Sequence, residues 1–571
     1  MNMKRITLIA TLALIATQAF AQHDEQVTVE GKYRPKVNKV NKLTLQPETP
    51  QPSYAFPSSE VTPKETKQKF ALDLEKISPT AFAAKNDKLV TPTQNFLMAG
   101  IGTRLSPVFL YKHNSMLTKT LGLGVGIKHN SSWLNIKDFA PSGYMNNAFD
   151  INVSNVMGDA LLNAGVTYNN DIYHYYGVNL SEVQLSEDQI ETTCPRQAYN
   201  TIGAFLRLSS TATQVGSMRH SGGVNYHYTF DRFGSSDHLL GASYGFAYPA
   251  SWWGKKAHPQ VVKLDAAFDF DSYGVYDTTN RTMRMELNPA FEMSDDFFSL
   301  HLGLVVNAGN LNPEESGLKW CLRPDLKGSL YVLDRQMEFY AGVNGGLKMF
   351  TYNEIIKENP FVYHLQPMQM QKVKFGFEGG VRTNLIGSLD IHLGVRYRHT
   401  DNDPFYVLQY GFVDNAVIAN RFDLLYDETH TVSVLADARV KLRNSLTADL
   451  GFAYNNCKPT TEEYAWYRPT AEVKLKLTYD FNDKLAFNTS LVYQGGRYAK
   501  VWDGVGDWQA TNFNAEKLKD VFDLSLGADY KVNDQISAFA LLDNVANQKY
   551  QLFYNYPVTG IQFFAGVKLR F

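Results

Sequence analysis

The feature that most constrains the fold is a regular alternation of apolar and polar side chains over unusually long segments. Apart from isolated exceptions, apolar residues occupy every second position at 373–381, 389–398, 432–442, 471–481 and 561–571. Successive side chains of a β-strand point to opposite faces of a sheet, so each segment predicts a strand with one apolar face. Strands of soluble proteins are most often about 5–6 residues long, and these are longer. A soluble extracellular β-sandwich is the alternative, but its strands would be shorter and its outward faces polar.

The connections between these segments are of two kinds. Short turns occur at 386–388, 442–445, 481–483 and 532–534, whereas 400–420, 455–467 and 495–513 predict long loops. Short turns at one end and long loops at the other are typical of outer-membrane barrels, in which the short turns are periplasmic. The sequence contains 21 candidate strand segments, and single-chain bacterial barrels have an even number. We expect Ser106-Pro107 to divide the region 94–113 into two strands, which gives 22, with 20 as the alternative.

Composition supports an all-β transmembrane antiparallel barrel and excludes other classes. The 571 residues are 13% aromatic, carry a net charge of −2 and have a mean hydropathy of −0.28. Near-neutral charge gives no sign of nucleic-acid binding, and a hydrophobic content of 44% excludes disorder throughout the chain. Low mean hydropathy argues only against a helical membrane protein, because transmembrane strands alternate. The three cysteines, Cys194, Cys321 and Cys457, are too few and too widely spaced for a disulfide framework or a metal motif.

The beginning of the chain predicts an export signal and a tail. Lys4-Arg5, an apolar stretch at 6–17 and Ala19-Phe20-Ala21 predict a signal peptide over 1–21, because it has the charged, apolar and small-residue regions in order. Residues 22–92 contain 8 of the 22 prolines and one glycine, which is typical of an extended polar segment. We therefore expect a short periplasmic segment over 22–92 and the barrel over 93–571.

The end of the chain resembles a known family. The stretch 542–550, the aromatic run 553–557, Gly560 and the final strand resemble the last hairpin of TonB-dependent receptors. That strand ends on an aromatic residue, Phe571, and so resembles the C-terminal signal by which the barrel-assembly machinery recognises outer-membrane proteins. Residues 25–34 resemble the start of those receptors' plug domains. The resemblance implies the outer membrane of a Gram-negative bacterium, contact with outer-membrane lipid, and binding of TonB or another periplasmic or outer-membrane protein by the plug-start-like residues Val27, Thr28 and Val29.

The sequence departs from the family in its plug. A plug domain normally takes well over a hundred residues, and the proline-rich stretch 22–92 is shorter. We therefore expect a receptor-type barrel without a full-length plug. The tail carries a net charge of +2 and the rest of the chain after it −6, which favours a tail that folds into the lumen. A tail that adds a strand to a periplasmic partner is the alternative.

Catalytic chemistry is not apparent in the sequence. It contains no nucleophile elbow, phosphate-binding loop, dinucleotide fingerprint or zinc-protease motif, so we predict that the protein is not an enzyme and needs no cofactor or metal. His392 and His399 are predicted to face the lumen or a loop. The acidic clusters 401–403 and 503–507 are interpreted as loop turns. The predicted loops contain the aromatic residues Tyr464, Trp466, Tyr467, Trp502 and Trp508. We interpret them as residues at the membrane interface, with stacking on sugars as the alternative.

Three functions remain open from the sequence. The leading hypothesis is solute uptake or passage through a polar lumen, with predicted lumen-lining residues Arg396, Arg439, Lys474, Lys476, Lys568 and Arg570. The second is a structural or assembly platform in an outer-membrane complex. An outer-membrane enzyme is the third and the weakest, because no catalytic constellation supports it.

Overall fold

The computed structural model describes residues 94–211, 217–250, 252, 260–311, 317–365, 368–414, 416–442, 445–504 and 512–571, without the side chains of 385 and 386. All of them belong to one compact unit, Lys88–Phe571. The predicted signal peptide, the tail and Val27–Val29 lie outside the described residues.

The elements are almost all strands. Their bounds are β1 Asn95–Gly102, β2 Ser106–Met116, β3 Leu121–Ser132, β4 Tyr144–Met157, β5 Ala160–His174, α2 Glu187–Thr193, β6 Arg196–Ser210, β7 Arg219–Asp231, β8 Ser236–Ala250, β9 Gln260–Val275, β10 Thr278–Ser294, β11 Phe298–Gly309, β12 Lys319–Val332, β13 Met337–Lys348, α3 Tyr352–Glu358, β14 Gln371–Ile386, β15 Leu389–Val413, β16 Ala416–Leu442, β17 Leu446–Pro459, β18 Ala471–Asp480, β19 Leu485–Gly495, β20 Tyr498–Trp502, β21 Phe513–Lys517, β22 Val521–Lys531, β23 Ile536–Asp543, β24 Gln551–Phe553, β25 Tyr556–Pro557 and β26 Gln562–Arg570. No helix in the described ranges is both long enough and apolar enough to cross a membrane.

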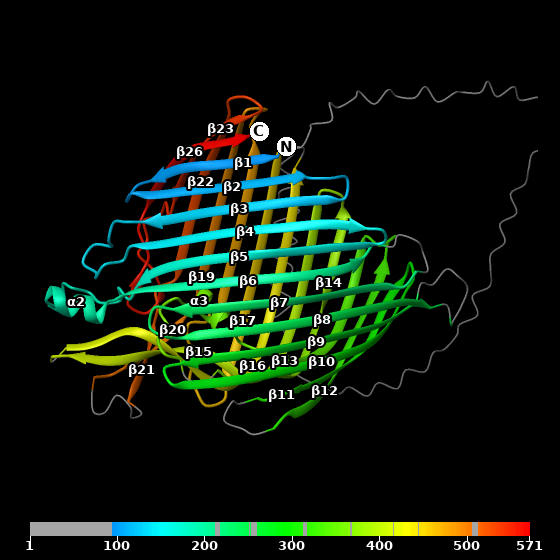
Figure 1. Ribbon diagram of the computed structural model, residues 1–571, viewed down its shortest axis with the longest axis horizontal. Helices are drawn as coiled ribbons and strands as arrows, with labels where there is room; N and C mark the ends of the chain where they lie inside the picture. Colours follow the sequence, from blue (N-terminus) through cyan, green and yellow to red (C-terminus); the bar gives the residue numbers. More distant parts are fainter. Residues whose placement is uncertain are drawn as a thin grey trace, which may run out of the picture. The chain divides into compact units, whose positions relative to one another are not determined.

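The main sheet has 22 antiparallel strands and closes on itself (Figure 1). Each strand pairs with its neighbours in the chain, and β1 pairs with β26. At the seam the Asn95 amide donates to the Phe571 carbonyl over 2.8 Å, and the Phe571 amide donates to the Asn95 carbonyl over 3.1 Å. The predicted number of 22 strands is confirmed, and because β1 pairs with β26, neither is an edge strand of the main sheet.

The region 94–113 contains two strands, as predicted. β1 and β2 pair from Gly102 opposite Ser106, and the chain reverses between them. Arg104 and Leu105 have positive φ angles of 71° and 49°, which is uncommon for residues other than glycine and occurs mostly in tight turns. Pro107 lies opposite Ile101 in β2, at the start of the strand, where a missing amide donor is tolerated.

The two faces of the wall differ as the alternation predicts. Outward side chains are large, apolar and exposed, for example Leu393 at 53% and Val395 at 48%. The alternate positions of β15 face inwards, and two of them, Asp390 and His392, line a cavity inside the barrel. Apolar residues outside and polar residues inside form the inverse of a soluble protein, and this pattern matches a barrel whose outer face contacts lipid.

The two ends of the barrel differ in their connections. We call the end that holds Asn95 and Phe571 the short-turn end and the opposite end the long-loop end (Figure 1). The long-loop end carries 175–195 with α2, 349–370 with α3, 496–520 with β20 and β21, and 544–561 with β24 and β25.

One sequence prediction at this end is wrong. The predicted loop 400–420 is mostly strand, because β15 and β16 pair as far as Val413 and Ala416 and are 25 and 27 residues long. Further along the chain, β21 pairs with β20, and the next strand of the barrel wall is β22. The two long strands extend beyond the rim because each supplies the other's hydrogen bonds.

Candidate functional site

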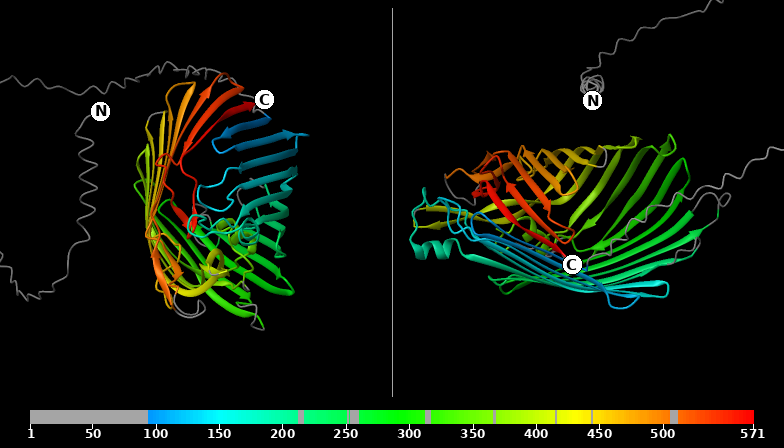
Figure 2. Two further views of the ribbon diagram at one scale, coloured as in Figure 1. Left: turned by 90° about the vertical axis from the view of Figure 1, so that its left-hand side faces the viewer. Right: turned by 90° about the horizontal axis from the view of Figure 1, so that it is seen from above.

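The lumen at the long-loop end is occupied by two loops of the barrel itself. One is 349–370, which carries α3, and the other is 544–561, which carries β24 and β25; together we call their described residues the lumen cap. In the end-on view α3 lies inside the ring of strands (Figure 2, left). The buried cluster at this level combines cap residues such as Phe361 and Tyr556 with wall residues such as Tyr199.

Local sequence explains why α3 forms in the first loop. Thr351 is an N-cap whose hydroxyl accepts from the Glu354 amide, and the Glu354 carboxylate accepts from the Thr351 amide. This capping box satisfies two amide donors at the start of the helix. The helix buries Tyr352, Ile355 and Ile356. A helix of seven residues is too short to be stable alone, so these packed side chains are what hold it in the lumen.

Three tyrosine hydroxyls attach the first loop to the barrel wall and to the neighbouring loop 175–195. Tyr175 donates to the Val362 carbonyl over 2.8 Å, and Tyr199 donates to the Pro360 carbonyl over 2.8 Å. In the third bond the donor is in the loop: Tyr352 donates to the carboxylate of Asp231 on the wall over 2.9 Å. Burial raises the pKa of the Tyr352 hydroxyl well above its usual range, so this group stays neutral and keeps its proton for the bond.

Backbone pairing on β16 fixes the same loop from the opposite side. The Phe422 amide donates to the Phe361 carbonyl over 3.1 Å, and the Tyr363 amide donates to the Phe422 carbonyl over 3.0 Å. The pair Val362 and Phe422 forms a parallel bridge, and both side chains are fully buried. The loop is therefore attached to the wall as a short additional strand, which is a more specific attachment than apolar contact alone.

Arg497 is one of the residues that hold the second loop. The residue is 2% exposed, and its guanidinium donates to the carbonyls of Gln551 over 2.9 Å and Leu552 over 3.1 Å, and also to the Lys519 carbonyl. Tyr556 donates to the Asn420 carbonyl of β16, and burial raises the pKa of its hydroxyl well above the usual range. A buried guanidinium that binds only carbonyl groups serves to position backbone.

Two cavities lie on the inner wall. The lower cavity, of about 780 Å³, is formed by β13–β19 towards the short-turn end. Its lining includes the basic residues Arg335, Arg382, Arg439, Lys474 and Lys476 and the acidic residues Glu338, Asp390, Asp437 and Asp449. The upper cavity, of about 830 Å³, is lined by the basic residues Lys348, Arg396, Arg398, Lys458 and Arg468 and by the acidic residues Asp403, Glu463 and Glu472. Both cavities therefore present charged side chains of both signs towards the lumen.

Four of the six residues predicted to line the lumen line one of these two cavities. Arg396 lines the upper cavity, 3.7 Å from Glu378, and Arg439, Lys474 and Lys476 line the lower one. Lys568 and Arg570 on β26 line neither cavity: Lys568 forms an ion pair with Asp529, and the Arg570 guanidinium lies 5.7 Å from the centre of the Phe96 ring.

Charge compensation differs within the upper cavity. Arg468 binds both carboxylate oxygens of Asp403, at 2.6 and 2.8 Å. Burial alone would lower the pKa of Arg468, but the bonds to Asp403 outweigh it and raise the pKa. Arg398 and Lys348 form no ion pair with any acidic side chain in the described part of the chain; Lys348 lies over the Phe350 ring, 4.5 Å from its centre. These two cations are available to a solute.

Several predicted positions require correction. His392 lines the lower cavity as expected and interacts with Asp437 over 3.0 Å. His399 does not face the lumen, because it follows the outward set of β15 that contains Val395 and Tyr397. Trp466 and Tyr467 are not at the membrane interface: they are 4% and 8% exposed and belong to the buried cluster around the cap.

The other predicted positions are placed as follows. Tyr464 stacks on Tyr498 with ring centroids 4.1 Å apart, and Trp502 contacts Tyr410. Asp401 and Asp403 are strand residues of β15 that pair with Lys374 and Arg468, so they are not a loop turn. Trp508 and most of the 503–507 cluster lie outside the described residues.

The lumen cap itself was not predicted. The capping box at Thr351–Glu354 was a readable signal for α3, and the density of aromatic residues in 550–557 was a second one.

Comparisons with known proteins agree with this architecture. No protein-family model and no curated protein matches the sequence. Among solved structures, the pyoverdine outer membrane receptor FpvA from Pseudomonas aeruginosa is 13% identical, with a TM-score of 0.61 over 84% of this chain and 79% of that chain. The siderophore receptor PirA from Acinetobacter baumannii is 12% identical, with a TM-score of 0.62 over 84% and 80%. The copper transporter OprC is 12% identical, with a TM-score of 0.57 over 84% and 81%.

These likenesses concern the fold. The described barrel has the fold of outer-membrane receptors of the TonB-dependent type, as the resemblance of the last hairpin predicts. The similar structures named above are receptors and a transporter.

Proposed function

We propose that the protein is an outer-membrane barrel that passes solute through its lumen, with the lumen cap as the gate. The observation that carries the proposal is the arrangement along the lumen: a hydrogen-bonded cap lies at the long-loop end, and two cavities lined by charged side chains lie on the inner wall. A barrel of 22 strands is too wide for its wall side chains to fill, so its interior is either plugged or open. Here the protein's own loops occupy part of that interior.

The upper cavity favours anionic solutes. Arg398 and Lys348 face it without an ion pair among the described side chains, Glu378 and Asp403 act on Arg398 only from a longer distance, and Arg396 lies 3.7 Å from Glu378. Positive charge that no ion pair neutralises attracts anions and repels cations, and in a confined space it does so more strongly than in bulk water. The solute class we propose is therefore a small anion or an anionic chelate.

Location and partners follow the same proposal. The outward apolar face contacts outer-membrane lipid, the barrel-assembly machinery inserts the chain, and the short-turn end faces the periplasm. Residues 22–92 either enter the lumen from that side or recruit a periplasmic partner such as TonB through Val27–Val29. Deleting residues 23–90 while keeping the signal separates the two: higher conductance indicates occlusion, and loss of co-purified TonB indicates recruitment.

Conductance in planar bilayers tests the gate. We expect wild-type protein to be mostly closed and a variant that lacks residues 352–358 to open stably. A variant with an equal deletion in the outer loop 183–193, which carries α2 and not the cap, is the control and should remain closed. A cap-deleted barrel that inserts normally and conducts no ions would contradict the proposed function.

A platform role is the second candidate, and one observation favours it. β15 and β16 run to 25 and 27 residues, and the β20–β21 ribbon lies at the same end (Figure 1). Such a projection offers a surface to another outer-membrane protein. If no cap variant conducts ions in the bilayer, and if mild solubilisation recovers a stable complex with another outer-membrane protein, this role is favoured over transport.

A further inference from the structure

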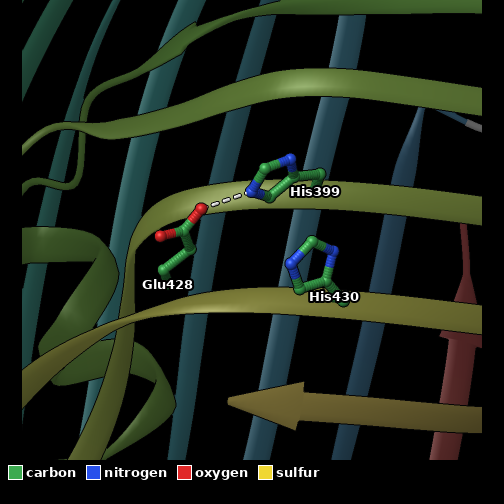
Figure 3. Close-up of side chains that lie close together, drawn as sticks. All are labelled: His399, Glu428 and His430. Carbon is green, nitrogen blue, oxygen red and sulfur yellow. Dashed lines mark hydrogen bonds and ion pairs between the residues drawn. The ribbon is translucent and has the colours of Figure 1, made fainter. Parts of the chain in front are cut away.

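Three side chains with metal-binding chemistry meet on the outer wall of the barrel. His399 of β15 lies opposite His430 of β16, and Glu428 precedes His430 by two positions on the same face of β16 (Figure 3). The two imidazole rings stack with centroids 4.2 Å apart and 23° between their planes. One donor atom from each of the three residues lies within 4.8 Å of the other two. Two paired strands thus hold two ring nitrogens and a carboxylate oxygen together.

We propose that His399, Glu428 and His430 form a binding site for a divalent first-row transition-metal ion. Two imidazole nitrogens and one carboxylate form a ligand set found for Zn²⁺ and for Fe²⁺, with the remaining positions open to water. Hard ions such as Mg²⁺ and Ca²⁺ prefer an all-oxygen set, so the two histidines discriminate against them. The site is independent of the transport proposal, because it faces away from the lumen.

Tyr397 orients one of the ligands. Its hydroxyl oxygen lies 2.9 Å from Nδ1 of His430. In the tautomer whose Nδ1–H donates to that oxygen, Nε2 presents its lone pair to the cluster. A hydrogen bond of this kind on the far nitrogen is the usual way in which a protein fixes the ring of a metal-binding histidine. The ring of Tyr397 is itself on the outward face, beside Phe375.

Lys374 competes with the ion for Glu428. Its ammonium lies 2.7 Å from Oε1 of Glu428 and 2.5 Å from Oδ1 of Asp401, and Glu428 also bonds to Nε2 of His399. When an ion takes Glu428, Lys374 retains Asp401 as its partner, so no charge is left alone. Without an ion, the same residues form an ion-paired network. The position of Lys374 therefore predicts that removing its charge strengthens metal binding.

The place of the site in the barrel also fits an exposed ion. His399 and His430 lie just beyond the outward apolar residues Val395, Tyr397 and Val432, where β15 and β16 leave the predicted lipid zone. His430 is exposed, so an ion and its water reach the site from outside the barrel. β15 and β16 pair in continuous register from Leu389 to Thr400, and the register shifts between Thr400 and Asp403, next to Glu428.

Titration of tag-free protein with Zn²⁺ tests the site. The protein is purified in detergent without chelators and titrated in competition with a fluorescent zinc chelator. We expect one saturable component, which the double substitution His399→Ala/His430→Ala abolishes and Glu428→Gln weakens. Tyr397→Phe should weaken it by about 10-fold or more, as for other outer-shell partners. Lys374→Met should tighten binding.

His220→Ala is the matched control. His220 also lies on the outer wall, with Nδ1 2.7 Å from the hydroxyl of Tyr244. Within the described part of the chain it contacts no second histidine and no carboxylate. Its loss should leave the zinc titration unchanged. Folding of every variant is checked by the slower electrophoretic migration that barrels show after boiling.

A spectroscopic measurement identifies the ligands directly. Electron paramagnetic resonance of the Cu²⁺-loaded protein should show coupling to two imidazole nitrogens, and His430→Ala should remove one of them. Equal zinc titrations of the wild type and the folded double-histidine variant would overturn the proposal. A Lys374→Met variant that binds Zn²⁺ no more tightly than the wild type would show that Glu428 is not a ligand, and the three-ligand site would fail on that result as well.

Discussion

The ring of Phe361 stacks on the ring of Tyr556, with centroids 3.6 Å apart and 18° between the two planes. The two residues belong to different loops of the lumen cap, 349–370 and 544–561, so this contact joins the halves of the cap to each other. Each loop is separately attached to the wall through β16, at Phe422 and Asn420. The cap is therefore one connected body with several attachments to the wall.

Substitution of Phe361 should loosen the cap. Phe361 is 9% exposed and also contacts Tyr176 and Phe553, so Phe361→Ala leaves a space in the middle of the aromatic cluster. Loss of a buried phenylalanine typically costs about 3–5 kcal/mol. We expect frequent channel openings in planar bilayers and faster proteolysis within 349–365. Phe481→Ala, at an exposed outward position, is the control and should behave like the wild type.

Substitution of Arg497 should release the second loop selectively. Arg497→Met keeps the length of the side chain but leaves the carbonyls of Lys519, Gln551 and Leu552 without their donor. A buried polar group that loses its partner costs about 1–3 kcal/mol. Hydrogen exchange should rise in 544–561 and change much less in 352–358. Uniform exchange across both loops would show that the cap opens as a single unit.

The sequence predicts the wall better than the interior because the two obey different rules. Strand alternation is local, so 432–442 and 471–481 could be read directly, and Pro107 marked the start of a second strand. The strand extension at 400–413 could not, because Asn402-Asp403-Pro404 reads as a turn and only pairing with β16 makes it a strand.

Contacts of the cap join residues far apart in the chain, such as Phe361 and Tyr556, and leave no periodic pattern. His399 is a different kind of error. The alternation of 389–397 already assigns it to the outward face, so a consistent extension of the pattern by one step would have placed it there and not in the lumen.

Acidic pH should loosen the cap through His364. This loop residue has Nε2 2.6 Å from the hydroxyl of Tyr276, in the β9–β10 turn, and the two rings stack. Burial lowers the pKa of His364. The charge of Asp231 offsets part of this shift, and the charge of Arg421 adds to it. The detached loop, with a histidine pKa of about 6.5, then binds a proton more readily than the attached loop.

The contribution of His364 to attachment is therefore complete above pH 6.5 or so and is lost as the pH falls from there towards the lowered value of the attached state. Open probability in the bilayer should rise between neutral and mildly acidic pH. His364→Gln, which cannot titrate, should flatten this dependence. An unchanged pH profile in His364→Gln would assign the effect to another group.

Anion preference should depend on the arginines of the upper cavity. In the Phe361→Ala background, which we expect to conduct, the reversal potential under a KCl gradient should indicate preference for chloride. Arg396→Gln/Arg398→Gln removes two cationic groups from that cavity and should shift the reversal potential towards zero or to cation preference. The paired change Lys568→Gln/Arg570→Gln, on the strand that lines neither cavity, should shift it much less.

The side chain of Phe571 should matter for assembly and not for closure of the finished barrel. Its backbone amide and carbonyl both bond to Asn95 at the seam, whereas its ring is 55% exposed on the outward face. Phe571→Ala keeps both backbone bonds and removes only the ring, so folded barrels should retain the stability of the wild type. The yield of heat-modifiable barrel in the outer membrane should fall, because the terminal aromatic residue resembles the signal read by the assembly machinery.

Phe563→Ala changes an outward phenylalanine of similar exposure within the same strand and is the control. Equal membrane yields for the two variants would show that the terminal position has no special role in insertion.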